Sequence, residues 1–168
     1  MIRIIWNELK QCLEIKDMEL LEIIEKKAKS LGACEKADNM QDYKDAVDRM
    51  FLNVGAHFCV KHRYPSKSYF RFAKPFVLQD DRVYIDAGDI ELKDCIDVCL
   101  VGNTNATLTY NGGRCIHKVL CFYGASANIR AYNRSVVRVF RVDAGNITKE
   151  KDSSSIILND VTPENAQI

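Results

Sequence analysis

Residues 61–76, KHRYPSKSYFRFAKPF, interleave basic and aromatic side chains, and no acid follows until Asp80. Cations that neutralise phosphates, set among rings that stack on bases, are typical of proteins that bind single-stranded nucleic acid. The alternative is a helix whose aromatic rings dock on a neighbouring domain while its Lys and Arg stems cover the junction. The residues expected to contact nucleic acid are Lys61, Arg63, Tyr64, Lys67, Tyr69, Arg71 and Lys74.

A second group, HFCVKH, places His57, Cys59 and His62 within six residues. Imidazole and thiolate are zinc ligands, but a structural zinc site needs a fourth ligand, which this segment lacks. A Cys nucleophile with a His base is a weaker prediction, because neighbours in sequence need not face one another. We therefore predict a packed segment with no metal, no cofactor and no catalytic residue. His117, alone in CIHKVL, is expected to be an ordinary strand residue.

Phosphate-binding loops and paired carboxylates are the remaining chemical candidates. GNTNATL and NGGRC lack the Lys-Ser/Thr pair and the following helix of a P-loop. Seven acids lie between residues 80 and 97, where they could hold a cation or flank a sugar. Charges at this density more often mark a solvated sheet edge, which they protect from association. We expect the second role.

Composition bounds the class of protein. The chain has 168 residues, 47% of them hydrophobic, and a net charge of +1, which argues against a surface built wholly for nucleic acid or membrane. It shows neither a secretory apolar region nor a stretch of bilayer length, so we expect a cytoplasmic location. The seven cysteines include no CxxC, and the absence of a secretory signal predicts reduced thiols. Four of them lie in strand-like runs and are expected to be buried: Cys95, Cys99, Cys115 and Cys121.

Helical spacing runs from residue 1 to about 78. Residues 17–33 have an apolar stripe, Asp17 placed as an N-cap and Gly32 after the end. Residues 38–52 repeat the helical spacing, with Asp38 or Asn39 as the cap. A shorter helix is indicated for residues 5–13. A third segment begins near Pro65 and is expected to close at Pro75.

Beyond about residue 82 the apolar period drops to two, and Gly or Asn recurs about every ten residues. The expected strands are 82–87, 89–92, 96–101, 106–110, 115–123, 127–132, 136–142 and 155–158. One strand and one tight turn fill each interval of about ten residues. Two architectures fit: a β-solenoid (a parallel β-helix) and an antiparallel meander or sandwich. Small residues that suit a narrow stacked core favour the solenoid: Ala106, Ala125, Ala127 and Ala131. The Asn111-Gly112 pair, a hairpin signal, favours the meander.

The strand 136–142, VVRVFRV, is apolar on both faces, so a second layer should cover it. Val137 and Val139 should face one way, with Phe140 and Val142 the other. The expected cover is a helical layer led by Leu20, Ile24 and Val47, while Tyr110 and Tyr132 lie nearer the solvent. The predicted organisation is α+β: a helical region 1–78, a solenoid-like domain 79–160 and a loose tail 161–168.

The segments VYIDAGDIEL, LVGNTNATLTYNGG and FYGASANIRAYN resemble a group of uncharacterised short-repeat β-solenoid proteins of gut anaerobic bacteria and their mobile elements. The resemblance covers about residues 80–160 and rests on corner Gly and Asn and inward Ala and Val. It implies a fold and no reaction. The stack is also similar to that of hexapeptide-repeat acyltransferases, although their six-residue period is absent here.

These observations favour a non-catalytic recognition or scaffold protein that acts through a protein-binding surface, because repeat folds present extended regular faces. The partner is an unknown protein, and the oligomeric state is open. The first alternative is single-stranded nucleic-acid binding through residues 61–76. The second is a β-helix enzyme that acts on a carbohydrate or acyl substrate. No membrane partner is expected.

Overall fold

The computed structural model describes residues 21–33, 40–77 and 82–167. The chain divides into two compact units, residues 1–50 and 51–168. The second unit joins two helices to the strand-rich part, so the change from helix to strand near residue 80 lies inside it. Among the described residues, no helix is both long and apolar enough to span a membrane.

The first unit contains a helix over residues 21–30, whose buried residues Leu21, Ile24 and Ala28 recur at helical spacing. It ends before Gly32, which has a φ of +85° and so supplies the left-handed residue that follows many helices. The predicted start at Asp17, the segment 5–13 and the position of Leu20 lie outside the described residues.

Helix α2, Tyr43–Phe51, follows in the first unit and reaches its boundary. The Asp42 carboxylate accepts a hydrogen bond from the Asp45 N–H at 2.7 Å, which caps the helix. The caps expected at Asp38 and Asn39 lie outside the described residues. Val47 and Met50 form the buried side of the helix, as their spacing predicts.

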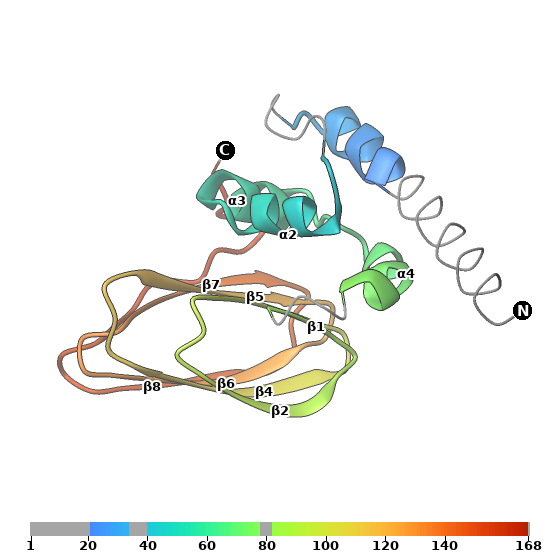
Figure 1. The fold of residues 1–168 in the computed structure, drawn as a ribbon. Coiled ribbons are helices and arrows are strands. Elements are labelled where there is room, and N and C mark those ends of the chain that lie inside the picture. Colours follow the sequence, from blue (N-terminus) through green and yellow to red (C-terminus); the bar gives the residue numbers. More distant parts are fainter. Residues whose placement is uncertain (1–20, 34–39, 78–81, 168) are drawn as a thin grey trace, which may run out of the picture. The chain divides into compact units, whose positions relative to one another are not determined.

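The second unit is a β-solenoid of two parallel sheets, and every strand pair in its described residues is parallel (Figure 1). Sheet A has the order β1-β3-β5-β7-β9, with β1 Val83–Ile85, β3 Asp97–Val101, β5 Ile116–Phe122, β7 Val136–Val142 and β9 Ile156–Ile157. Sheet B has the order β2-β4-β6-β8, with β2 Gly88–Lys93, β4 Thr104–Asn111, β6 Ser126–Tyr132 and β8 Ile147–Lys151. The chain alternates between the sheets, so each coil adds one strand to each. The predicted solenoid is confirmed, and the hairpin alternative at Asn111-Gly112 is wrong because β4 and β5 belong to different sheets.

Four left-handed residues, one from each successive coil, turn the chain out of sheet A at the same corner: Asp86, Gly102, Tyr123 and Asp143, with φ between +46° and +66°. The backbone N–H of Asp86, Gly102 and Tyr123 each donates to the end of the sheet A strand in the next coil. Glycine at position 102 leaves room for the Asp86 side chain, because a Cβ there would lie 2.2 Å from an Asp86 carboxylate oxygen. This stacked corner produces the regular spacing of turn residues in the sequence.

The core between the sheets is narrow and apolar. The predicted inward residues Ala106, Ala127 and Ala131 are buried there, and Ala125 is buried at a corner. Tyr110 is also fully buried, so its predicted place near the solvent is wrong. It shares the inward alternation of Ala106 and Leu108, and its ring fills the end of the core beside His117.

The last coil replaces a core residue with a charge. Lys149 occupies the register position that Leu108 and Ile129 fill in the preceding coils. Its ammonium pairs with the carboxylate of Asp160, which also accepts a hydrogen bond from Arg141 Nη1 at 3.2 Å. We call these three residues the polar plug. Strand β8, which carries Lys149, was not predicted because the alternation in ITKEK lacks an apolar side.

Two helices of the second unit cover the outer face of sheet A (Figure 1). Helix α3, Asn53–Lys61, was not predicted as a helix; it contacts β7, and its His57 ring lies edge-on to Phe140 at 5.4 Å. Helix α4, Lys67–Val77, contacts β1 and contains Pro75, so the expected end at Pro75 is wrong. A proline in the last turn removes only one hydrogen bond and leaves the helix intact.

The alternation predicted for β7 is confirmed. Val137 and Val139 belong to the core between the sheets, whereas Phe140 is buried on the outer face. The contact described on Phe140 comes from α3, which was not among the expected covering residues. Val161, expected in a loose tail, is buried and pairs with Phe140 through the backbone.

Candidate functional site

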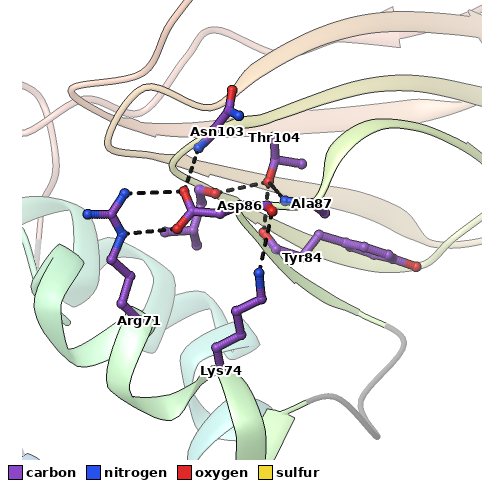
Figure 2. A network of polar contacts seen from close by, with 8 residues as sticks. Arg71, Lys74, Tyr84, Asp86, Ala87, Asn103 and Thr104 are labelled. Atoms are coloured by element: carbon purple, nitrogen blue, oxygen red, sulfur yellow. Dashed lines mark hydrogen bonds and ion pairs between the residues drawn. The ribbon is translucent and has the colours of Figure 1, made fainter.

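Two basic side chains of residues 61–76, Arg71 and Lys74, reach the stacked corner of the solenoid (Figure 2). Arg71 Nε donates to Asp86 Oδ2 at 2.9 Å, and Lys74 Nζ donates to the Asp86 carbonyl oxygen at 3.4 Å. At the far end of the same corner, Arg63 forms an ion pair with Asp143. These three cations therefore attach the segment to its own domain.

The aromatic side chains of the segment are also packed. Tyr64 is buried, and the Phe70 ring stacks on Phe122 with centroids 5.6 Å apart. The Tyr123 hydroxyl lies 2.7 Å from the carbonyl oxygens of both Arg63 and Pro65. The left-handed corner residue Tyr123 thus binds the loop before α4. These contacts match the alternative prediction, in which the segment docks on a neighbouring structure.

Of the seven residues predicted to bind nucleic acid, Lys61, Arg63 and Arg71 are exposed, and Lys67 is half-buried. Among the described residues, Lys61 and Lys67 form no ion pair, whereas Arg63 and Arg71 do. Tyr69 is half-buried against Tyr64. The Phe72 side chain on α4 is 54% exposed. Most of the described basic and aromatic side chains of the segment are therefore engaged within the domain.

The Asp86 carboxylate is the centre of the polar contacts in Figure 2. The Arg71 guanidinium, followed by the Asn103 N–H, lowers the pKa of Asp86 below its ordinary value. Thr104 completes the corner: its hydroxyl donates to the Val101 carbonyl at 2.9 Å and accepts the Ala87 N–H at 3.1 Å. The Asp86 carboxylate and the Thr104 hydroxyl thus join neighbouring coils at this corner by hydrogen bonds.

His57 and Cys59 lie on α3, His62 directly follows it, and the three side chains are not brought together. The His57 ring contacts Phe140, whereas His62 follows the helix and packs on Phe58. Cys59 is buried, and burial raises the pKa of its thiol to about 12. A thiol that stays protonated at neutral pH is a poor nucleophile and a poor metal ligand.

His117 is a buried strand residue. Its Nδ1–H donates to the Cys95 carbonyl oxygen at 3.0 Å, and its ring stacks on Tyr110. Within the described ranges, no group of three or more His, Cys, Asp and Glu side chains could hold a metal ion.

The four strand-run cysteines are free, but their predicted burial holds only in part. Cys99 and Cys121 are fully buried, and burial raises the pKa of Cys121 to about 12. Cys95 is half-buried. Cys115 is exposed, because it lies in the corner between β4 and β5 and not in a strand.

A row of exposed aliphatic residues lies on the outer face of sheet A. Ile116 pairs in register with Val136, and Val136 with Ile156. Ile116 is 48% exposed and Ile156 52%, with Val136 half-buried between them. Ile96, 61% exposed, precedes β3; its carbonyl accepts the Lys118 N–H of β5, which sets it opposite His117 and one position out of register with Ile116. We call Ile116, Val136 and Ile156 the aliphatic row.

Basic residues flank the aliphatic row on both sides. Lys118 and Arg138 form the next outward row, where Lys118 pairs with Asp97 at 3.5 Å. The buried Nε of Arg138 has no hydrogen-bond partner among the described residues. Arg114 and Arg134 are exposed in the corners two residues before Ile116 and Val136. This surface was not predicted, although aliphatic residues twenty positions apart are visible in the sequence.

Comparison of the chain with protein-family models, curated proteins and solved structures finds no match.

Proposed function

We propose that this protein is a non-catalytic recognition module that binds a protein partner through the outer face of sheet A. The aliphatic row carries the proposal, because it exposes β-branched side chains in successive coils while Leu120 and Phe140, further along the same face, are fully buried. Contiguous apolar side chains rimmed by charges are typical of protein interaction sites.

Photo-crosslinking from defined positions tests the proposal. A photoreactive residue at Ile116 or at Ile156 should crosslink one protein in the native host, whereas the same residue at Phe72 should not. Phe72 is the matched control, since it is an equally exposed apolar residue on α4. Equal crosslinking from all three positions, or none from the row, would contradict the proposal.

The second candidate function is binding of single-stranded nucleic acid by residues 61–76. The exposed Lys61, the half-exposed Lys67 and the exposed Phe72 ring support it. Affinity for a single-stranded oligonucleotide should then fall as salt rises and should weaken in a Phe72→Ala variant. Nuclease treatment in parallel with the crosslinking separates this candidate from the first.

We further propose a cytoplasmic location, which agrees with five free cysteines in the described residues. We also propose kinship with the short-repeat β-solenoid proteins of gut anaerobes and their mobile elements. The left-handed corners and small core residues that carry this resemblance support it.

A further inference from the structure

The partner that fits the aliphatic row is identified by the spacing and the charge of the surface. The row crosses the strands of sheet A, so its side chains recur at the distance between neighbouring strands, about 4.8 Å. From Ile116 to Ile156 it spans about 10 Å. An occupant must therefore offer one apolar side chain about every 5 Å along a line.

An α-helix meets this spacing. Its apolar face repeats once per turn, about every 5.4 Å, so two turns match the length of the row. An extended peptide places side chains of one face almost 7 Å apart and loses register within two coils. A helix that runs across the strands can thus set one residue beside each member of the row.

The flanking charges define the rest of the partner. Lys118 is neutralised by Asp97, but Arg138 keeps a buried Nε without an acceptor, and Arg114 and Arg134 are exposed. The positive charge of Arg138 also helps to lower the pKa of the neighbouring His57, after the larger effect of burial. Carboxylates beside the apolar stripe of a helix would pair with these guanidinium groups.

A second copy of the chain fits less well. A symmetric dimer about the row would bring the Arg114, Arg134 and Arg138 side chains of one copy against the same residues of the other. Like charges set opposite one another oppose association.

We propose that the aliphatic row binds an acidic amphipathic helix of a partner protein. This inference rests on the proposed function and names the class of partner. Ile116, Val136 and Ile156 receive the apolar stripe of the helix, and Arg138 with the two corner arginines receives its carboxylates.

Three labelled peptides of about 14 residues provide the test, with binding to the full chain measured by fluorescence anisotropy. The first has a Leu stripe flanked by Glu, the second has the same composition in scrambled order, and the third replaces every Glu by Lys. We expect the first to bind more tightly than either of the others by about tenfold or more. We expect its affinity to fall by a similar factor in an Ile116→Ser/Ile156→Ser variant and in Arg138→Gln. It should not change in Phe72→Ser.

Row residues are exposed, so an unchanged thermal melt establishes that each variant is folded. Equal binding of the three peptides, or binding that ignores the row variants, overturns the inference. So does row-dependent binding of anionic lipid vesicles, or row-dependent dimerisation in sedimentation, without binding of the acidic peptide. If the acidic peptide fails while crosslinking from Ile116 and Ile156 still captures one protein, the partner class is wrong and the proposed function stands. If that crosslinking also fails, both are wrong.

Discussion

Replacing Phe140 by Ala should destabilise the second unit strongly. Phe140 is fully buried on the outer face of sheet A, with the His57 ring of α3 edge-on at 5.4 Å. Removing a buried Phe side chain costs about 3 to 5 kcal/mol, from lost burial plus the cavity left behind. The whole free energy of unfolding of such a domain is about 5 to 15 kcal/mol, so the loss is a large fraction of it.

Thermal unfolding followed by circular dichroism measures the effect. In a domain of this size each kcal/mol lowers Tm by about 4 °C or more, so Phe140→Ala should melt roughly 10 to 20 °C below the parent. Phe72→Ala is the matched control, since the same side chain is 54% exposed there and its loss should move Tm by about 2 °C at most. If the two variants melt together, α3 does not pack on β7 and the two-layer account of sheet A is refuted.

Three further outcomes are expected. Arg71 is the chief cause of the lowered pKa of Asp86 in the folded protein, so the ionised Asp86 carboxylate stabilises the fold above pH 4 and this stabilisation is lost as pH falls through the folded pKa. Arg71→Gln should therefore make Tm depend less on pH in the acid range. An unchanged profile of Tm against pH would show that the ion pair contributes nothing to stability. Gly102→Ala should lower the Tm of the protein more than Gly88→Ala, because both residues have a positive φ but only a Cβ at Gly102 meets the Asp86 carboxylate. Equal Tm values for the two variants would argue against the close approach of Asp86 to Gly102. A thiol reagent should modify Cys115 within the native state and the two fully buried strand thiols only on unfolding, whereas uniform rates would contradict their burial.

The solenoid could be predicted because its coils repeat the same local signals. Gly and Asn at the corners and Ala in the core constrain each coil in the same way, so the sequence sums several weak signals for one architecture. The sequence of strand β8 lacks an apolar alternation, because Lys149, an inward residue of the last coil, is charged. A pattern of alternation cannot show that an inward register position is occupied by a charged residue in an ion pair.

The candidate site was predictable only in composition. The basic and aromatic residues of 61–76 were recognised, but their partners Asp86 and Asp143 come from distant coils, and only folding brings them to one corner. Helix α3 was missed because HFCVKH reads as a chemical motif, while its apolar Ala56, Cys59 and Val60 are buried at helical spacing. Exposure of the aliphatic row follows from where α3 and α4 stop, which local sequence does not encode.

The polar plug has a consequence for how long such a protein can be. A parallel coil offers the next coil an open core and two unpaired strand edges, so a repeat of this kind has no intrinsic end. Arg141, Asp160 and Lys149 place fixed charges where another apolar layer would stack. Duplication of an internal coil would lengthen the molecule and keep its terminus intact, whereas growth beyond β9 would need to bury those ions. The plug thus opposes the stacking of a further coil on this end of the solenoid.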